Sequence, residues 1–276
     1  MAEGAGDYAA ALRRVPWTPR GFSDQGSPEA NVAALLAWAE AHPGPEAEAI
    51  DWALGSFRAT VPAPQTQTQG ATMSVYAIFY QDAVTDREGL AAYQQQAGPT
   101  IAPFKPAAKV VTEANIETIE GDWKPARIVM LEFATKEDAL GWHKSPAYGE
   151  VMKLRHAATK GGGGILVETL PIPGGHPKPV YGIFFQDAIH DQNALNEYQQ
   201  KAGPTLGAYQ CIPRVATTAV EHLEGDWPAV RVVVLEFPDR ETAKAWHSSP
   251  EYSAVKGIRL NATHGAGVLV DGIPAR

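Results

Sequence analysis

The chain has 276 residues, of which 45% are hydrophobic and 20% are charged, values that are ordinary for a globular protein of about two domains. Its formal net charge of -8 argues against a general affinity for nucleic acid or anionic membrane, because both require basic surface. The single cysteine, Cys211, excludes an internal disulfide and a cysteine-based zinc site, and no stretch approaches the roughly 18 apolar residues of a membrane span.

The N-terminal segment, residues 1–72, lacks the basic start and long apolar core of a secretory signal, so we expect a soluble cytoplasmic protein. Ser27-Pro28 is typical of a helix start, and Pro43-Gly44-Pro45 would break that helix before a second one begins near Glu46. Residues 61–72 have the composition of a linker. We therefore predict a small helical extension that ends in a linker.

The remainder of the chain is an internal duplication. Five segments return in the same order and with nearly the same spacing: YAIFYQDAVTD (76–86) as YGIFFQDAIHD (181–191), AYQQQAGPT (92–100) as EYQQKAGPT (197–205), EGDW (120–123) as EGDW (224–227), RIVMLEF (127–133) as RVVVLEF (231–237), and WHKSPAY (142–148) as WHSSPEY (246–252). Self-similarity of this kind indicates two copies of one structural unit. We place the modules at 73–172 and 178–276.

Each module predicts the same order of elements. In the first, strands rich in branched and aromatic residues are expected at 75–81, 109–119, 127–133 and 165–170. One helix follows the N-cap Asp86 and stops at Gly98-Pro99, and a second starts at Thr135 or Lys136 and is interrupted at Ser145-Pro146. The order β-α-β-β-α-β is that of an α+β ferredoxin-like fold.

Both faces of the third strand are substantially apolar, with Val129 and Leu131 on one face and Ile128 and Met130 on the other. A four-stranded sheet with its helices on one face needs cover on the other face. We therefore predict two modules packed sheet to sheet within one chain, as an intramolecular pseudo-dimer, with residues 171–179 as a short non-helical connector. Association of two such chains into a homodimer remains open.

The set QD…YxxxAGPT…EGDW…SPxY, in this order, closely resembles the family catalogued as domain of unknown function 1330. The resemblance covers both repeats and excludes residues 1–72. It implies a dimeric α/β-barrel, usually formed by two identical chains, without an established activity. Relatives of that fold include cofactor-free monooxygenases, lactone isomerases, polyketide cyclases, and haem-binding chlorite dismutase and dye-decolorising peroxidase types. Fold by itself does not dictate function.

Two repeated residue types on the second helix are candidates for catalysis. His143 and His247 could act as acid or base near neutral pH, or as ligands, although the alternative is a helix histidine packed on the neighbouring tryptophan. Tyr148 and Tyr252 could donate a hydrogen bond to a substrate carbonyl and stabilise an enolate, or could be core tyrosines with satisfied hydroxyls.

Further candidates lie on the strands and at the end of the second helix. Glu132 and Glu236, expected to face the barrel centre, could serve as bases of raised pKa or pair with arginines from other elements. Arg155 and Arg259 could hold a bound anion or cap carbonyls. Gln81 and Gln186 end the first strand of each module, where loops commonly build sites, so we include them as candidate substrate-binding residues.

The leading hypothesis is a cofactor-independent enzyme that acts on a small carbonyl or aromatic compound by isomerisation, cyclisation or oxygenation. We expect no metal and no cofactor, because no P-loop, dinucleotide fingerprint or zinc motif occurs in the sequence. The alternatives are a non-catalytic small-molecule binding or stress-response protein, and a haem-binding protein. The expected partner is a small-molecule ligand, with neither nucleic acid nor membrane.

Overall fold

The computed structural model describes residues 74–274, so the predicted helical extension lies outside the described residues. The first module contains eight principal elements: β1 (Val75–Gln81), α4 (Arg87–Ile101), β3 (Ala107–Thr112), β4 (Glu117–Glu120), β5 (Arg127–Phe133), α5 (Lys136–His143), α6 (Pro146–Ala158) and β7 (Gly163–Glu168). The short strands β2 (Ala83–Val84) and β6 (Thr159–Lys160) pair with each other. The order agrees with the predicted β-α-β-β-α-β, including the interruption of the second helix between α5 and α6, except that β3 and β4 replace the single strand predicted over 109–119.

The second module repeats these elements: β8 (Val180–Ile189), α7 (Gln192–Ala202), β9 (Ile212–Thr217), β10 (Glu221–Gly225), β11 (Arg231–Phe237), α8 (Arg240–His247), α9 (Pro250–Ala262) and β12 (Thr263–Asp271). Short 3-10 turns follow the first helix of each module. Equivalent side chains cap equivalent helices. Asp86 and Asp191 accept a hydrogen bond from the first turn of α4 and α7, and Ser145 and Ser249 do so for α6 and α9.

The two modules exchange a strand. The five-stranded sheets have the orders β10-β7-β1-β5-β3 and β4-β12-β8-β11-β9, and their pairs are antiparallel. The edge strand β10 of the first sheet therefore comes from the second module, and the edge strand β4 of the second sheet comes from the first. Each module completes the sheet of the other.

The single strand predicted over 109–119 is wrong. The chain forms β3, turns, and continues as β4 in the other sheet. Asn115 adopts a left-handed conformation with φ of 56°, and the Thr112 side chain closes the turn by accepting a hydrogen bond from the amide of Ala114. An unpaired strand edge is costly, and β4 finds its partner in β12.

The predicted helix stop at Gly98-Pro99 is also wrong for the first module, where α4 continues to Ile101. Pro99 has no N–H, so the carbonyl oxygen four residues before it lacks its helical hydrogen bond. Because Gly98 and Pro99 are exposed, water can reach this side of the helix and bind that oxygen. In the second module the same dipeptide does end α7, and a 3-10 turn follows at Gly203–Thr205.

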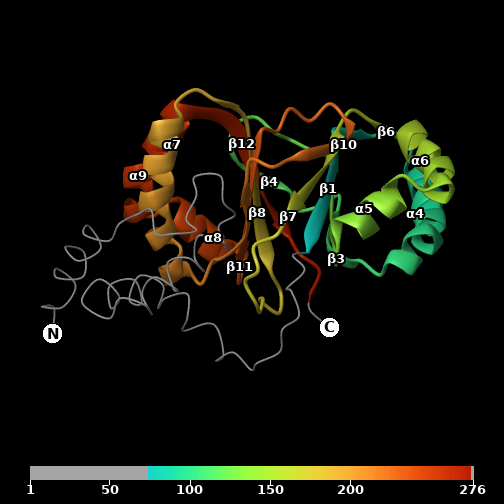
Figure 1. Cartoon of the computed structure of the whole chain (residues 1–276), viewed down its shortest axis with the longest axis horizontal. Coiled ribbons are helices and arrows are strands. Elements are labelled where there is room, and N and C mark those ends of the chain that lie inside the picture. Colours follow the sequence, from blue (N-terminus) through green and yellow to red (C-terminus); the bar gives the residue numbers. More distant parts are fainter. Residues whose placement is uncertain (1–73, 275–276) are drawn as a thin grey trace, which may run out of the picture. The chain divides into compact units, whose positions relative to one another are not determined.

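Three apolar clusters form the core. One lies between the two sheets and combines side chains of both modules, including Ile128 and Met130 with Val232 and Val234. The other two lie between each sheet and its own helices. In Figure 1, α4, α5 and α6 lie on one side of the strands and α7, α8 and α9 on the other. Among residues 74–274, no helix combines the length and the apolar character that a membrane crossing requires.

Candidate functional site

A cavity of about 290 Å³ lies in the first module, where α4 and α6 cover the sheet. Its volume is at the lower end of the range for small-molecule sites, roughly 300–1,000 Å³. The wall is largely apolar and the polar groups are few. Its lining includes Phe79, Gln81, Tyr93, Arg127, Trp142, Tyr148 and Arg155.

Two tyrosines from different helices meet at this cavity. Tyr93 of α4 and Tyr148 of α6 are buried, and their hydroxyl oxygens are 3.0 Å apart. Burial raises the pKa of Tyr148, with a further upward contribution from Tyr93. The phenol therefore stays protonated at neutral pH, where it can donate a hydrogen bond and cannot act as a base.

An ion pair between the two modules lies beside the tyrosines, and its arginine, Arg155, lines the cavity. The Nη1 and Nη2 atoms of Arg155 donate to the two carboxylate oxygens of Glu224, each at 2.6 Å. Glu224 belongs to β10, the strand that comes from the second module. His143 Nε2 lies 3.2 Å from the same carboxylate, and the imidazole stacks on Phe79 at a centroid distance of 5.9 Å. Arg155 is thus held in place by a carboxylate that its own module does not supply.

The second module repeats this arrangement with Glu120 of β4. Arg259 donates to both of its carboxylate oxygens at 2.6 Å, and His247 Nε2 lies 3.7 Å away. The hydroxyls of Tyr198 and Tyr252 are 3.1 Å apart, and Arg259 Nη2 donates to Tyr252 at 3.2 Å. These two hydrogen bonds fix the direction of donation. Because Arg259 donates to the hydroxyl of Tyr252, that hydroxyl donates its own proton to Tyr198, and the proton of Tyr198 remains available for another acceptor.

The two exchanged glutamates are acids of low pKa. Burial by itself raises the pKa of Glu224, but hydrogen bonds from His143 and Arg155 outweigh it and lower the pKa to about 2. Burial also raises the pKa of Glu120, but the two hydrogen bonds from Arg259 and the nearby His247 outweigh this effect and lower the pKa to about 2. Both carboxylates are therefore ionised in the folded protein throughout the physiological range, and they neutralise the arginines beside the tyrosines.

This pKa difference predicts acid sensitivity. In the unfolded chain these glutamates titrate near the ordinary 4.5, so the stability they contribute is complete above that pH and is lost as the pH falls toward about 2. The loss should reach about 3 kcal/mol for each carboxylate. Urea unfolding measured between about pH 5 and about pH 2.5 checks this. Glu120→Gln/Glu224→Gln should have a shallower pH dependence than the wild type, and an unchanged slope would contradict the assignment.

The strand carboxylates that the sequence singled out lie elsewhere. Glu236 accepts from Arg214 Nε at 2.8 Å and from the amide of His176 in the connector, so it ties the linker to β11. Glu132 is paired with Lys109 Nζ at 2.8 Å and accepts from Ser74. Glu236 thus has the arginine partner that the sequence left open, Glu132 has a lysine instead, and neither carboxylate lines the cavity.

Of the sequence candidates, the structure brings Tyr148, Arg155 and Gln81 together at one cavity and places His143 directly behind it. Tyr252, Arg259, Gln186 and His247 take the equivalent places in the second module. Sequence reasoning missed Tyr93, Arg127 and the two glutamates of EGDW. The repeated Tyr93/Tyr198 and EGDW were visible signals, but nothing in the linear order shows that β4 and β10 change sheets.

The glycine run 161–164 is where the exchanged strand β10 pairs with β7. Gly162 has φ of +95°, and a Cβ there would lie 2.1 Å from the carbonyl oxygen of Tyr80. A Cβ on Gly163 would meet Trp227, and one on Gly164 would meet the ring of Phe79 and the Glu224 side chain. The absence of side chains lets β10 approach β7 closely enough to bring Glu224 to Arg155. The run is a packing surface, and Gly163 and Gly164 belong to β7.

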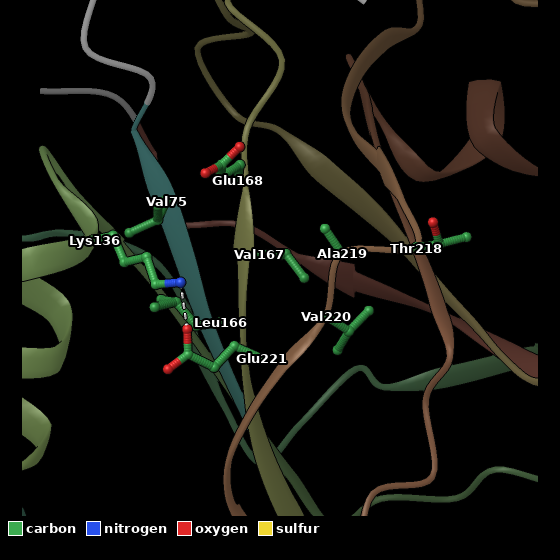
Figure 2. Close-up of a pocket in the computed structure, with 9 residues that line it drawn as sticks. All are labelled: Val75, Lys136, Leu166, Val167, Glu168, Thr218, Ala219, Val220 and Glu221. Carbon is green, nitrogen blue, oxygen red and sulfur yellow. Dashed lines mark ion pairs between the residues drawn. The ribbon is translucent and has the colours of Figure 1, made fainter. Parts of the chain in front are cut away.

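A second hollow, of about 300 Å³, lies at the seam between β7 and the segment that leads into β10. Figure 2 shows its main polar contact, in which Lys136 reaches Glu221 of the other module; the two are 2.6 Å apart. The lysine is thereby neutralised, and the remaining wall is made of small apolar side chains and the exposed Glu168. It offers fewer convergent polar groups than the cavity under α4 and α6.

Metal binding finds no support in residues 74–274, where no three side chains among His, Cys, Asp and Glu are grouped as a metal ion requires. Cys211 is a lone, partly buried thiol whose pKa is raised by burial.

The fold and the cavities define an α+β protein made of two strand-exchanged ferredoxin-like modules. The model of the family described as Domain of unknown function (DUF1330) matches residues 74–170 and 179–273, more than half of the chain. The chain belongs to this family, as two tandem copies.

Solved structures with partial similarity include an anthrone oxidase-like protein, at 10% identity and a TM-score of 0.45, covering 77% of this chain and 96% of that one. A mutant chlorite dismutase from Candidatus Nitrospira defluvii is 10% identical with a TM-score of 0.46, covering 72% and 92%. A protein of unknown function from Rhodopseudomonas palustris is 16% identical with a TM-score of 0.31, covering 43% and 92%. No curated protein matches the chain. At these scores the similarities do not assign a function.

Proposed function

We propose that this chain binds a small, largely apolar carbonyl compound in its helix-covered cavity and acts on it as a cofactor-independent enzyme of the isomerase, cyclase or monooxygenase type. We further propose that the exchanged strands make one chain the equivalent of a two-chain barrel. The observation that carries the proposal is the buried tyrosine pair at the cavity, backed by an arginine that the other module neutralises.

The chemistry follows from the donors. When negative charge develops on a substrate oxygen, a preorganised phenol in a dry site stabilises it more than water does, because it needs no reorientation. One hydroxyl proton of the Tyr93–Tyr148 pair joins the two tyrosines and the other can be donated to such an oxygen, while Arg155 stays bound to Glu224. His143 is a positioning residue in this scheme, since it contacts Glu224 and Phe79 and does not line the cavity.

A non-catalytic binding protein is the second candidate, and one observation favours it. The side chains that line the cavity include donors but neither a carboxylate nor a histidine. An enzyme that forms an enolate would thus need a substrate acidic enough to lose its proton to water or to another group. Haem has less support, because His143 is already engaged by Glu224 and no histidine lines the described cavity.

The test begins with a native mass spectrum of protein purified gently from its own host, which identifies any bound molecule by the mass released on denaturation. Turnover of that molecule, or of its carbonyl-bearing relatives, is then measured for Tyr93→Phe/Tyr198→Phe, which removes the hydroxyl whose proton remains available in the tyrosine pair. We expect kcat to fall about 100-fold while binding weakens much less, because the donor acts mainly on developing charge.

The matched control is Tyr80→Phe, which removes a hydroxyl from the cluster between the sheets and should leave kcat within about twofold of the wild type. Equal turnover by the tyrosine variants and the wild type would overturn the catalytic role. Tight binding with no turnover of any related compound would favour the binding protein.

A further inference from the structure

The described residues contain five buried arginines, and three of them are paired with a glutamate: Arg155 with Glu224, Arg214 with Glu236 and Arg259 with Glu120, at 2.6 to 2.8 Å. The other two are Arg127 and its equivalent Arg231. Neither has a carboxylate within ion-pair distance among residues 74–274. Arginine stays charged in proteins, so each is an uncompensated positive charge.

The surroundings of Arg127 leave its donors largely unused. It is only 4% exposed, and its Nη1 donates to Gln81 Oε1 at 2.8 Å. Its Nε, and the Nε2 of Gln81, are buried without a hydrogen-bond partner in the described structure. Burial lowers the pKa of Arg127, which shows that the protein bears an electrostatic cost at this position. A buried charge that destabilises the fold and has no counter-ion is typical of a functional site.

The side chains of Arg127 and Gln81 line the cavity beside an apolar wall that is formed by Phe79, Leu131 and Trp142. A bound anion would supply the missing negative charge, and no carboxylate in the cavity lining would repel it. Guanidinium and amide donors suit a carboxylate group, and the aromatic wall suits a planar or branched apolar body. The hydrogen bond recurs in the second module, where Arg231 Nη1 donates to Gln186 Oε1 at 2.7 Å.

Building on the proposed function, we propose that the ligand of this cavity is a small organic acid, whose carboxylate lies against Arg127 and Gln81 while its apolar body lies against Phe79 and Trp142. The volume of about 290 Å³ fits an acid with one or two rings. The tyrosine pair then faces a second oxygen of the same molecule.

Titration calorimetry on the full chain tests this with matched acids and amides: benzoate with benzamide, cinnamate with cinnamamide, and 2-naphthoate with 2-naphthamide. We expect at least one acid to bind about tenfold or more tightly than its amide. Arg127→Met/Gln81→Leu should lose the first-module site, and adding Arg231→Met/Gln186→Leu should abolish the preference for acids. The exposed Arg87→Met removes the same charge and should change nothing.

The outcomes separate the two proposals. Equal binding of acids and amides, or an acid preference that survives all four substitutions, overturns the anion proposal and leaves the carbonyl-binding cavity standing. Binding of neither class counts against both. Urea unfolding without ligand gives a second readout. Arg127→Met/Gln81→Leu should be as stable as the wild type or more stable, because an unpaired buried charge is removed together with its partner. A large loss of stability would assign Arg127 to the fold and overturn the proposal.

Discussion

Replacing Glu224 by glutamine is expected to destabilise the protein by about 3–5 kcal/mol, the usual cost of removing one partner of a buried ion pair. The substitution leaves Arg155, which is 4% exposed, without its bidentate carboxylate and removes the negative charge that His143 Nε2 contacts. It also weakens the hold of β10 on the first module, because Glu224 is the polar anchor of that exchanged strand. Urea unfolding at pH 7 measures the effect.

Two variants separate the buried charge from other causes. Arg155→Met/Glu224→Leu removes both charges together and should recover a large part of the loss, since no uncompensated ion remains. Glu150→Gln breaks an exposed pair with Lys153 on the same helix and should cost less than about 1 kcal/mol. If Glu224→Gln is as stable as the wild type, Arg155 is reached by water or by another acid and the ion pair does not join the modules.

Gly162→Ala is the second large effect, with an expected loss of about 3–5 kcal/mol, which is exceptional for a single methyl group. The backbone at Gly162 has φ of +95°, a conformation that strains any residue with a Cβ. The added methyl would also lie 2.1 Å from the carbonyl oxygen of Tyr80, so the strand β1 or β7 would have to move. Thermal and urea unfolding give the magnitude.

The chain provides its own control one residue further on. Gly163 corresponds to Ala266 in the second module, where an alanine already stands against the exchanged strand β4. Gly163→Ala should therefore cost clearly less than Gly162→Ala, although its Cβ would meet Trp227. Equal losses at the two positions would mean that crowding against β10, and not backbone strain together with the Tyr80 carbonyl, determines the need for glycine in this run.

The duplication and the strand exchange together explain why the two arginine–glutamate pairs depend on each other. Arg155 in the first module is held by Glu224 from the second repeat, and Arg259 in the second module is held by Glu120 from the first. Between them, Trp123 and Trp227 of the two EGDW segments pack at a centroid distance of 5.4 Å in the core between the sheets. Neither module can form its arginine pair without the other.

The amino-acid sequence by itself determined the duplication, the order of elements apart from the division of 109–119 into β3 and β4, and the positions where helices start or are interrupted. These are local or repetitive properties: Asp86 and Ser145 cap helices because a side-chain oxygen reaches an amide three residues away, and alternation along 127–133 shows two buried faces. Tyr148 and Arg155 could be named as candidates because they recur.

Only the tertiary structure decided where the remaining partners come from. Whether Glu120 serves as a turn residue or as the counter-ion of Arg259, 139 residues away, depends on which sheet β4 joins. Arg127 could be read from the sequence as a strand arginine, but its lack of a counter-ion becomes visible only when every neighbour is in place. Periodicity reports which face of a strand is buried; it carries no information about which distant strand completes the sheet, because that choice is made by packing and hydrogen bonding between segments that are far apart in the chain.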